Sequence, residues 1–164
     1  MTNSVQIKAS VCALESALKG FIDSGALGDA VPDCSVKHWF SPVIEEYGCG
    51  TYAREFFMPA GSIIVGKIHK HAHISFLLKG KVVIASESGR EIMEAPHTFV
   101  SEVGAKRALY IIEDAVVTTV HLTRFSSEDE LEEIEEEVIA ESYSQIGLDE
   151  PDVALVGKLL EELT

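Results

Sequence analysis

The middle of the chain, from Thr51 to Thr123, consists of short apolar runs separated by residues that favour turns. The runs are rich in β-branched and aromatic residues and recur at spacings of roughly eight to twelve residues. Short strands at regular spacing, without helices between them, are typical of an antiparallel sandwich or barrel. The predicted strands are residues 51–58, 62–69, 74–80, 81–86, 98–103, 108–112 and 116–123. The pattern therefore predicts a mainly β fold, a single jelly roll (double-stranded β-helix) whose one mouth can hold a ligand.

The N-terminal residues show helical periodicity instead. Apolar positions recur every three or four residues over residues 4–23, and two glycines, Gly25 and Gly28, follow them. The stripe consists of Ile7, Val11, Leu14, Leu18 and Ile22. We expect one helix that lies on the sheet or on a partner subunit.

Two further helices are predicted after Arg124. Ser127 and Glu130 have the spacing of a capping box, and an apolar stripe of Leu131, Ile134 and Val138 follows. A second helix start is predicted at Asp149-Glu150-Pro151. Its stripe would consist of Val153, Val156, Leu160 and Leu163. Because there is little other helix to pack on, these helices are expected to cover the sheet or to clasp a second subunit.

Residues 28–50 contain prolines and glycines without clear periodicity, which indicates a loop with short extended pieces. Within this segment, Trp39 and Phe40 are expected to pack against the body of the protein. The chain length of 164 residues favours one compact domain. Its predicted parts are an N-terminal helix and loop segment (1–49), a β-barrel (50–124) and acidic C-terminal helices (125–164).

The formal net charge of −14 is concentrated in one segment. Residues 126–164 hold 14 acidic residues and one basic residue, whereas residues 1–125 are nearly neutral. An acidic chain without a basic stripe is a poor binder of nucleic acid, so we expect no nucleic-acid partner. The acidic helices are either a solvated face or a surface that mimics nucleic acid or docks a partner.

Cysteine use and hydropathy indicate the compartment. The three cysteines, Cys12, Cys34 and Cys49, have no C-x-x-C spacing, and their odd number argues against a disulfide framework. The first ten residues lack the basic start and apolar run of a secretory signal, and no apolar segment reaches membrane-spanning length. We therefore expect a cytoplasmic protein without membrane association.

Three of the six histidines, His69, His71 and His73, alternate within one predicted strand region. On an extended strand they would point to one face; if a tight turn interrupts the run, His71 would lie at its tip. His121, near the end of the last predicted strand, can line the same cavity. Three imidazoles are a workable site for a divalent first-row metal, with His69 and His73 joined by His71 or His121.

The region from 51 to 123 resembles the cupin superfamily. The first cupin motif is Gly, five residues, His-x-His, three or four residues, Glu, six residues and Gly. Gly61 and Gly80 occupy the two glycine positions of this motif. Lys67 and His69 fall on the His-x-His pair, and His73 falls on the Glu. The chain is similar to small cupins encoded in phage genomes.

The second cupin motif has Pro-x-Gly before a histidine. Glu102-Val103-Gly104 matches its glycine, and Arg107 stands where the histidine is expected. Lys67 and Arg107 therefore replace two ligands by cations, and Arg107 cannot ligate a metal. If both face inward they suit a carboxylate or phosphate; otherwise they pair with acids at the rim. Further candidate ligand contacts on the strands are Tyr52, Arg54 and Tyr110.

These observations favour a metal-binding cupin that binds or transforms a small anionic molecule in the barrel mouth. The metal would be iron, manganese, nickel or zinc, and the protein is expected to be a homo-oligomer. The resemblance is compatible with isomerase, oxygenase and hydrolase chemistry, and no residue stands out as catalytic. The alternatives are a metal-free protein that sequesters a small ligand, and an interaction protein that uses its acidic C-terminal helices.

Overall fold

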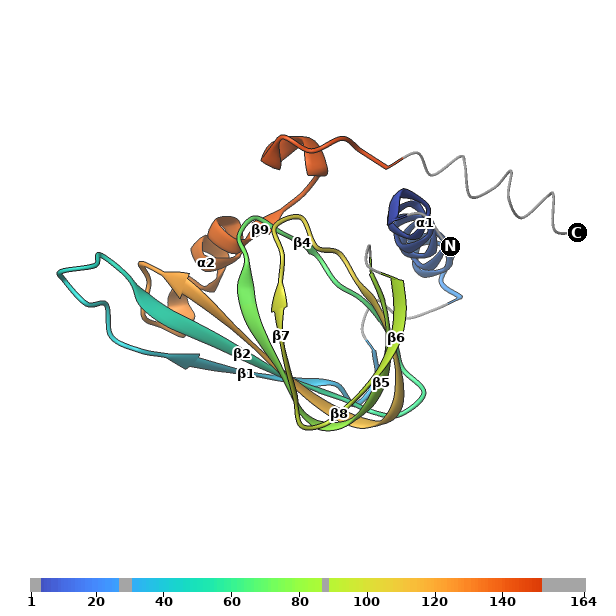
Figure 1. Cartoon of the computed structure of the whole chain (residues 1–164), viewed down its shortest axis with the longest axis horizontal. Coiled ribbons are helices and arrows are strands. Elements are labelled where there is room, and N and C mark those ends of the chain that lie inside the picture. Colours follow the sequence, from blue (N-terminus) through green and yellow to red (C-terminus); the bar gives the residue numbers. More distant parts are fainter. Residues whose placement is uncertain (1–3, 27–30, 87–88, 152–164) are drawn as a thin grey trace, which may run out of the picture.

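Two long antiparallel strands, β5 (His73–Ser86) and β8 (Ala108–Thr123), pair in the middle of the large sheet (Figure 1). The computed structural model describes residues 4–26, 31–86 and 89–151. The other strands are β1 (Ser35–Phe40), β2 (Gly50–Met58), β3 (Ile63–Val65), β4 (Ile68–His69), β6 (Gly89–Glu94), β7 (His97–Ser101) and β9 (Ile139–Ala140). The helices are α1 (Ser4–Asp23), α2 (Leu131–Val138) and the 3₁₀ helices η1 (Glu128–Glu130) and η2 (Tyr143–Ile146).

Both long strands bend near their middle, which folds one sheet into two layers. The pairing of β5 with β8 shifts register on both sides of Gly80. Gly80 has a φ of +86°, and a Cβ at this position would lie 2.3 Å from the carbonyl oxygen of Asp114. Only glycine therefore permits the two strands to approach so closely at the bend.

The bend assigns each shorter strand to a layer. One layer contains β1, β2, the second half of β8, the first half of β5, and β7. The other contains β3, the first half of β8, the second half of β5, and β6. The core between the layers is built from Met58, Leu77, Val82, Ile84, Met93, Ile111 and Ala115.

The helices lie outside the layers. Helix α1 lies against β5, and α2, whose Ile134 and Val138 are buried, lies beside β8 and β9 (Figure 1). A second, smaller cluster of Ile68, Ala140 and Tyr143 joins β4, β9 and η2. Among the described residues, no helix is long and apolar enough to cross a membrane.

The structure confirms the predicted mainly β fold, the helix over residues 4–23 and the capping box at Ser127. Several element boundaries were wrong. Residues 74–80 and 81–86 form one bent strand, as do 108–112 and 116–123, because Gly80 produces a bend and not a turn. The predicted strand 62–69 is divided into β3 and β4, and β6 was missed.

The segment before residue 50 is more regular than its sequence indicated. Strand β1 pairs with β2 over all six of its residues. Phe40 stacks on Tyr52, as expected for packing, but Trp39 is 57% exposed on the outer face of the sheet. The predicted second C-terminal helix falls largely on residues 152–164, outside the described residues.

Candidate functional site

Three strands bring three imidazoles together between the layers. His69 ends β4, His73 begins β5 and His121 lies near the end of β8. One nitrogen from each ring lies within 4.8 Å of one nitrogen of the others. The ring centroids are 4.2 Å apart for His69 and His73, 4.3 Å for His73 and His121, and 5.4 Å for His69 and His121. Residues distant in the sequence thus form a compact three-histidine group.

Strand geometry explains the convergence. His73 and His121 occupy inward positions on neighbouring strands of one layer and are buried. His69 reaches them because β4 leaves the large sheet and pairs with β9, and the chain then bends at Lys70 and His71 before β5 begins. The amide of Gly104 donates to the carbonyl of His69 at 2.8 Å and fixes this short strand.

Burial keeps the three rings neutral. It is the main cause that lowers the pKa of His69 and of His121 to about 3, and the neighbouring histidines and Arg54 lower both pKa values further. Burial also lowers the pKa of His73. Near neutral pH, each imidazole therefore has a nitrogen lone pair for a metal ion and no proton to displace.

The site fits a divalent metal ion. The Nδ1 atom of His69 is buried without a hydrogen-bond partner in the described structure. Such an orphaned nitrogen is rare in a protein interior and is expected where a ligand has its place. Since imidazole nitrogens are preferred ligands of first-row metals, the donor set and the orphaned atom agree.

A cavity of about 400 Å³ adjoins the histidines. Its apolar part includes Phe56, Met58, Leu77, Val82, Ile84 and Val117. Its polar lining consists of Arg54, Lys67, His69, His73, Ser75, Ser101, Arg107 and Thr119. Among the described residues that line it, three are cations and none is acidic, although the chain has a net charge of −14.

The inward side chains of the first layer change in polarity with depth. In the row with the histidines, Tyr52 is paired with His121, and their rings stack. The next row contains Arg54, Thr119 and Ser75, and the row after it contains Phe56, Val117 and Leu77. The cavity is therefore polar beside the histidines and apolar at greater depth.

Each of the three cations has a different environment. The Arg54 guanidinium lies 4.5 Å above the ring of Phe56, and within the described chain it has no hydrogen bond or ion pair. Arg107 donates from Nη1 to Ser101 Oγ at 2.9 Å, and Ser101 in turn contacts Ser75 Oγ at 3.0 Å. Lys67 is more exposed and forms an ion pair with Glu135 of α2.

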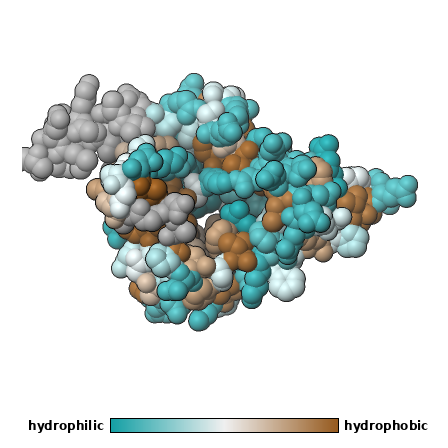
Figure 2. Space-filling model, turned by 180° about the vertical axis from the view of Figure 1, so that it is seen from behind, coloured by the Kyte–Doolittle hydropathy of each residue, from teal (hydrophilic) through white to brown (hydrophobic). Residues whose placement is uncertain are grey.

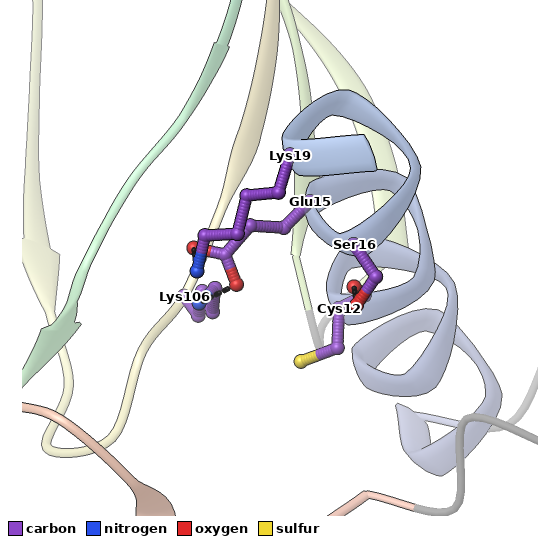
Figure 3. A network of polar contacts seen from close by, with 5 residues as sticks. All are labelled: Cys12, Glu15, Ser16, Lys19 and Lys106. Carbon is purple, nitrogen blue, oxygen red and sulfur yellow. Dashed lines mark hydrogen bonds and ion pairs between the residues drawn. The ribbon is translucent and has the colours of Figure 1, made fainter. Parts of the chain in front are cut away.

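The loop that carries Arg107 is tied to helix α1. Lys106 is buried and its ammonium donates to Glu15 at 2.7 Å, while Lys19 approaches the same carboxylate from the next turn (Figure 3). Burial alone would raise the pKa of Glu15, but the bond to Lys106 holds this pKa below its usual value. The ion pair links the position of α1 to the loop beside the cavity.

The remaining candidate residues lie elsewhere. His71 is exposed and lines an outer groove of about 730 Å³, together with Cys49 and one side of His121. Tyr52 is buried and bonds to His38 Nδ1 at 2.8 Å, so it supports His121 from behind. Tyr110 is exposed and does not line the cavity.

Several lining residues escaped the sequence analysis, among them Ser75, Phe99, Ser101 and Thr119. Their signal is a period of two. Thr119 lies two residues before His121, and Ser75 lies two residues after His73. Each follows from an inward histidine because alternate residues of a strand share a face.

No family model and no curated protein matches the sequence. Solved structures resemble it in fold at low identity. KdgF from Halomonas sp. is 15% identical, with 63% of this chain and 89% of that chain covered and a TM-score of 0.47. A salicylate 1,2-dioxygenase from Pseudaminobacter salicylatoxidans is 11% identical, with 75% and 34% covered and a TM-score of 0.49, so this chain spans about a third of it.

A cupin 2 domain-containing protein from Halorhodospira halophila is 10% identical, with 65% and 80% of the chains covered and a TM-score of 0.45.

The face of the molecule turned away from Figure 1 shows apolar patches among hydrophilic side chains (Figure 2). The two antiparallel layers, formed by bent strands around a cavity, agree with the mainly β, jelly-roll architecture predicted from the sequence.

Proposed function

We propose that this chain is a metal-binding cupin that holds or transforms a small anionic molecule in the cavity between its layers. One observation carries the proposal. Three neutral imidazoles converge beside a cavity whose described lining contains three cations and no acid. The first feature suits a metal ion and the second suits an anion.

His69, His73 and His121 would hold the metal, which is one of iron, manganese, nickel or zinc. When bound by three imidazoles, such an ion leaves coordination positions for a ligand oxygen and polarises it. The protein residues keep the rings neutral by burial and fix their orientation. His121 is fixed by Thr119, whose Oγ1 lies 3.1 Å from Nε2, and by the Tyr52 ring behind it.

The cations would bind and orient the anion. Arg54 and Arg107 both line the cavity, and a guanidinium can donate two parallel hydrogen bonds to one carboxylate. Their charges act in a region partly shielded from water, where a Coulomb interaction is stronger than at the surface. Lys67 lies at the rim and is engaged by Glu135, so it contributes attraction at longer range.

The metal is tested by elemental analysis of the full chain, purified without a histidine tag and then incubated with Zn²⁺ and desalted. We expect about one ion per chain in the wild type and none in His69→Ala/His73→Ala. The matched control is His97→Ala, since His97 is exposed on β7 and lies outside the three-histidine group. Equal metal in the double variant and the wild type would contradict the proposed centre. Absence of metal from both would favour the metal-free binding protein.

A further inference from the structure

We propose that the anion is amphipathic: a carboxylate held at Arg54, carrying an apolar body that fills the deep part of the cavity. This inference rests on the small-anion function proposed above and adds the class of molecule. It follows from three observations: the change from polar to apolar side chains with depth, the absence of an ionic partner for Arg54 in the described chain, and the lack of polar side chains in the deep part of the cavity.

The order of side chains gives the direction in which the ligand lies. The row beside the histidines and the row with Arg54 and Thr119 offer imidazole, hydroxyl and guanidinium groups. One row deeper, Phe56, Val117 and Leu77 offer only hydrocarbon. Val82 and Ile84 of the opposite layer add to this apolar end. A head group is therefore satisfied near the histidines, and an apolar body gains by leaving water at the other end.

Arg54 is the cation whose charge lacks compensation. Lys67 is paired with Glu135, and Arg107 donates to Ser101. The Arg54 side chain is half-buried, and burial lowers its pKa, yet no acid of the described chain contacts it. A buried charge without a partner is costly, and a bound carboxylate would offset that cost. The ring of Phe56, whose centroid lies 4.5 Å from the guanidinium carbon, helps to hold the guanidinium in place.

The deep part of the cavity also excludes a class of anions. A polyhydroxylated acid, such as a sugar acid, would place hydroxyl groups against the hydrocarbon of Phe56, Leu77 and Val117, and these side chains offer no hydrogen-bond partner. Each buried hydroxyl without a partner loses affinity. The cavity therefore favours an acid whose polar atoms are confined to one end.

The test measures binding of butyrate, hexanoate, octanoate and decanoate by calorimetry, on the zinc-loaded and the metal-free full chain. We expect the affinity to rise about three- to fourfold for each added methylene until the cavity is filled, as burial of about 0.8 kcal/mol per methylene gives. Octanol and glucuronate should each bind at least tenfold more weakly than octanoate. Equal affinity along the carboxylate series, or for octanol and octanoate, would overturn the proposal.

Variants locate the head group. Arg54→Met keeps a long apolar side chain and should weaken octanoate binding at least tenfold, whereas Arg54→Lys should retain part of it. Arg90→Gln is the control, because Arg90 is exposed on β6 and outside the cavity. Unchanged octanoate affinity in Arg54→Met, with the melting temperature of the wild type, would overturn the assignment of Arg54. Binding of octanoate by His69→Ala/His73→Ala without metal would support the ligand class while separating it from the metal centre.

Discussion

Near the histidines, strands β2, β5 and β8 reverse the usual polarity of a half-buried sheet. Their inner face is polar and their outer face is apolar. At the histidine end, the inner face holds His73, Ser75, Arg54, Thr119 and His121. The outer face of the same segments holds a row of apolar residues paired across five strands. This row, called the outer row below, consists of Trp39, Ala53, Val120, Ile74 and Val100.

The difference separates function from stability along the same strands. Polar side chains are rarely buried unless a partner or ligand satisfies them, and exposed apolar rows are rare unless something covers them. Toward the bend, the inner face becomes apolar, and Leu77 lies in the core. The proposed site therefore lies at the histidine end, and the buried apolar side chains near the bend pack the two layers together.

The largest effect on stability is expected from the two neighbouring leucines near the bend. Leu77 is 1% exposed and Leu78 is 53% exposed, so the same truncation tests the two faces. Leu77→Ala should lower the free energy of unfolding by about 2–5 kcal/mol, because it removes core contacts and leaves a void. Leu78→Ala should change it by less than about 0.5 kcal/mol. Urea unfolding of both variants checks this, and similar losses would show that the faces are not distinct.

The second effect concerns acid. The pKa of His121 is about 3 in the folded chain and near 6.5 when unfolded. Between these pH values the His121 ring is protonated in the unfolded chain and neutral in the folded chain. The contribution of neutral His121 to the free energy of unfolding is therefore complete above about pH 6.5 and is lost as the pH falls toward 3. In the metal-free protein, His121→Gln should reduce the pH slope of the free energy of unfolding by about 1.4 kcal/mol per pH unit. Urea unfolding at several pH values between 4 and 6 measures it, and an unchanged slope would mean that the ring is not buried as described.

Much of the fold was predictable because its signals are local. The stripe of α1, the capping box before α2 and the alternation in most strands each follow from neighbouring residues. The bends were not predictable, since Gly80 has the same local signal in a bulge as in a turn. Residues 28–50 were predicted only as a loop with short extended pieces, because Trp39 and Val36 of β1 are exposed, which removes the usual alternation against a core.

The candidate site was only partly predictable for a different reason. The three-histidine group depends on pairing between β5 and β8 and on the bend after β4, which no local pattern specifies. The sequence left open whether His71 or His121 is the third imidazole, and the described structure groups His121 with His69 and His73. The directions of Lys67 and Arg107 were open as well, because a shift of one residue reverses the face of every side chain on a strand.

The smallest effect on folding, and the sharpest test of the outer face, concerns self-association. The homo-oligomer expected from the sequence remains a prediction. We expect a second copy to bind at the outer row, because this row is uncharged whereas acidic residues gather on α2. Ile74→Lys should change the free energy of unfolding by less than about 0.5 kcal/mol at an exposed site, yet shift the protein toward monomer in sedimentation analysis. Ile92→Lys is the matched control, because Ile92 is exposed on β6, away from the row. The prediction would be contradicted if the wild type sediments as a monomer, or if the two variants sediment alike. The outer row would then have no role in self-association, and only the inner face would differ from an ordinary sheet.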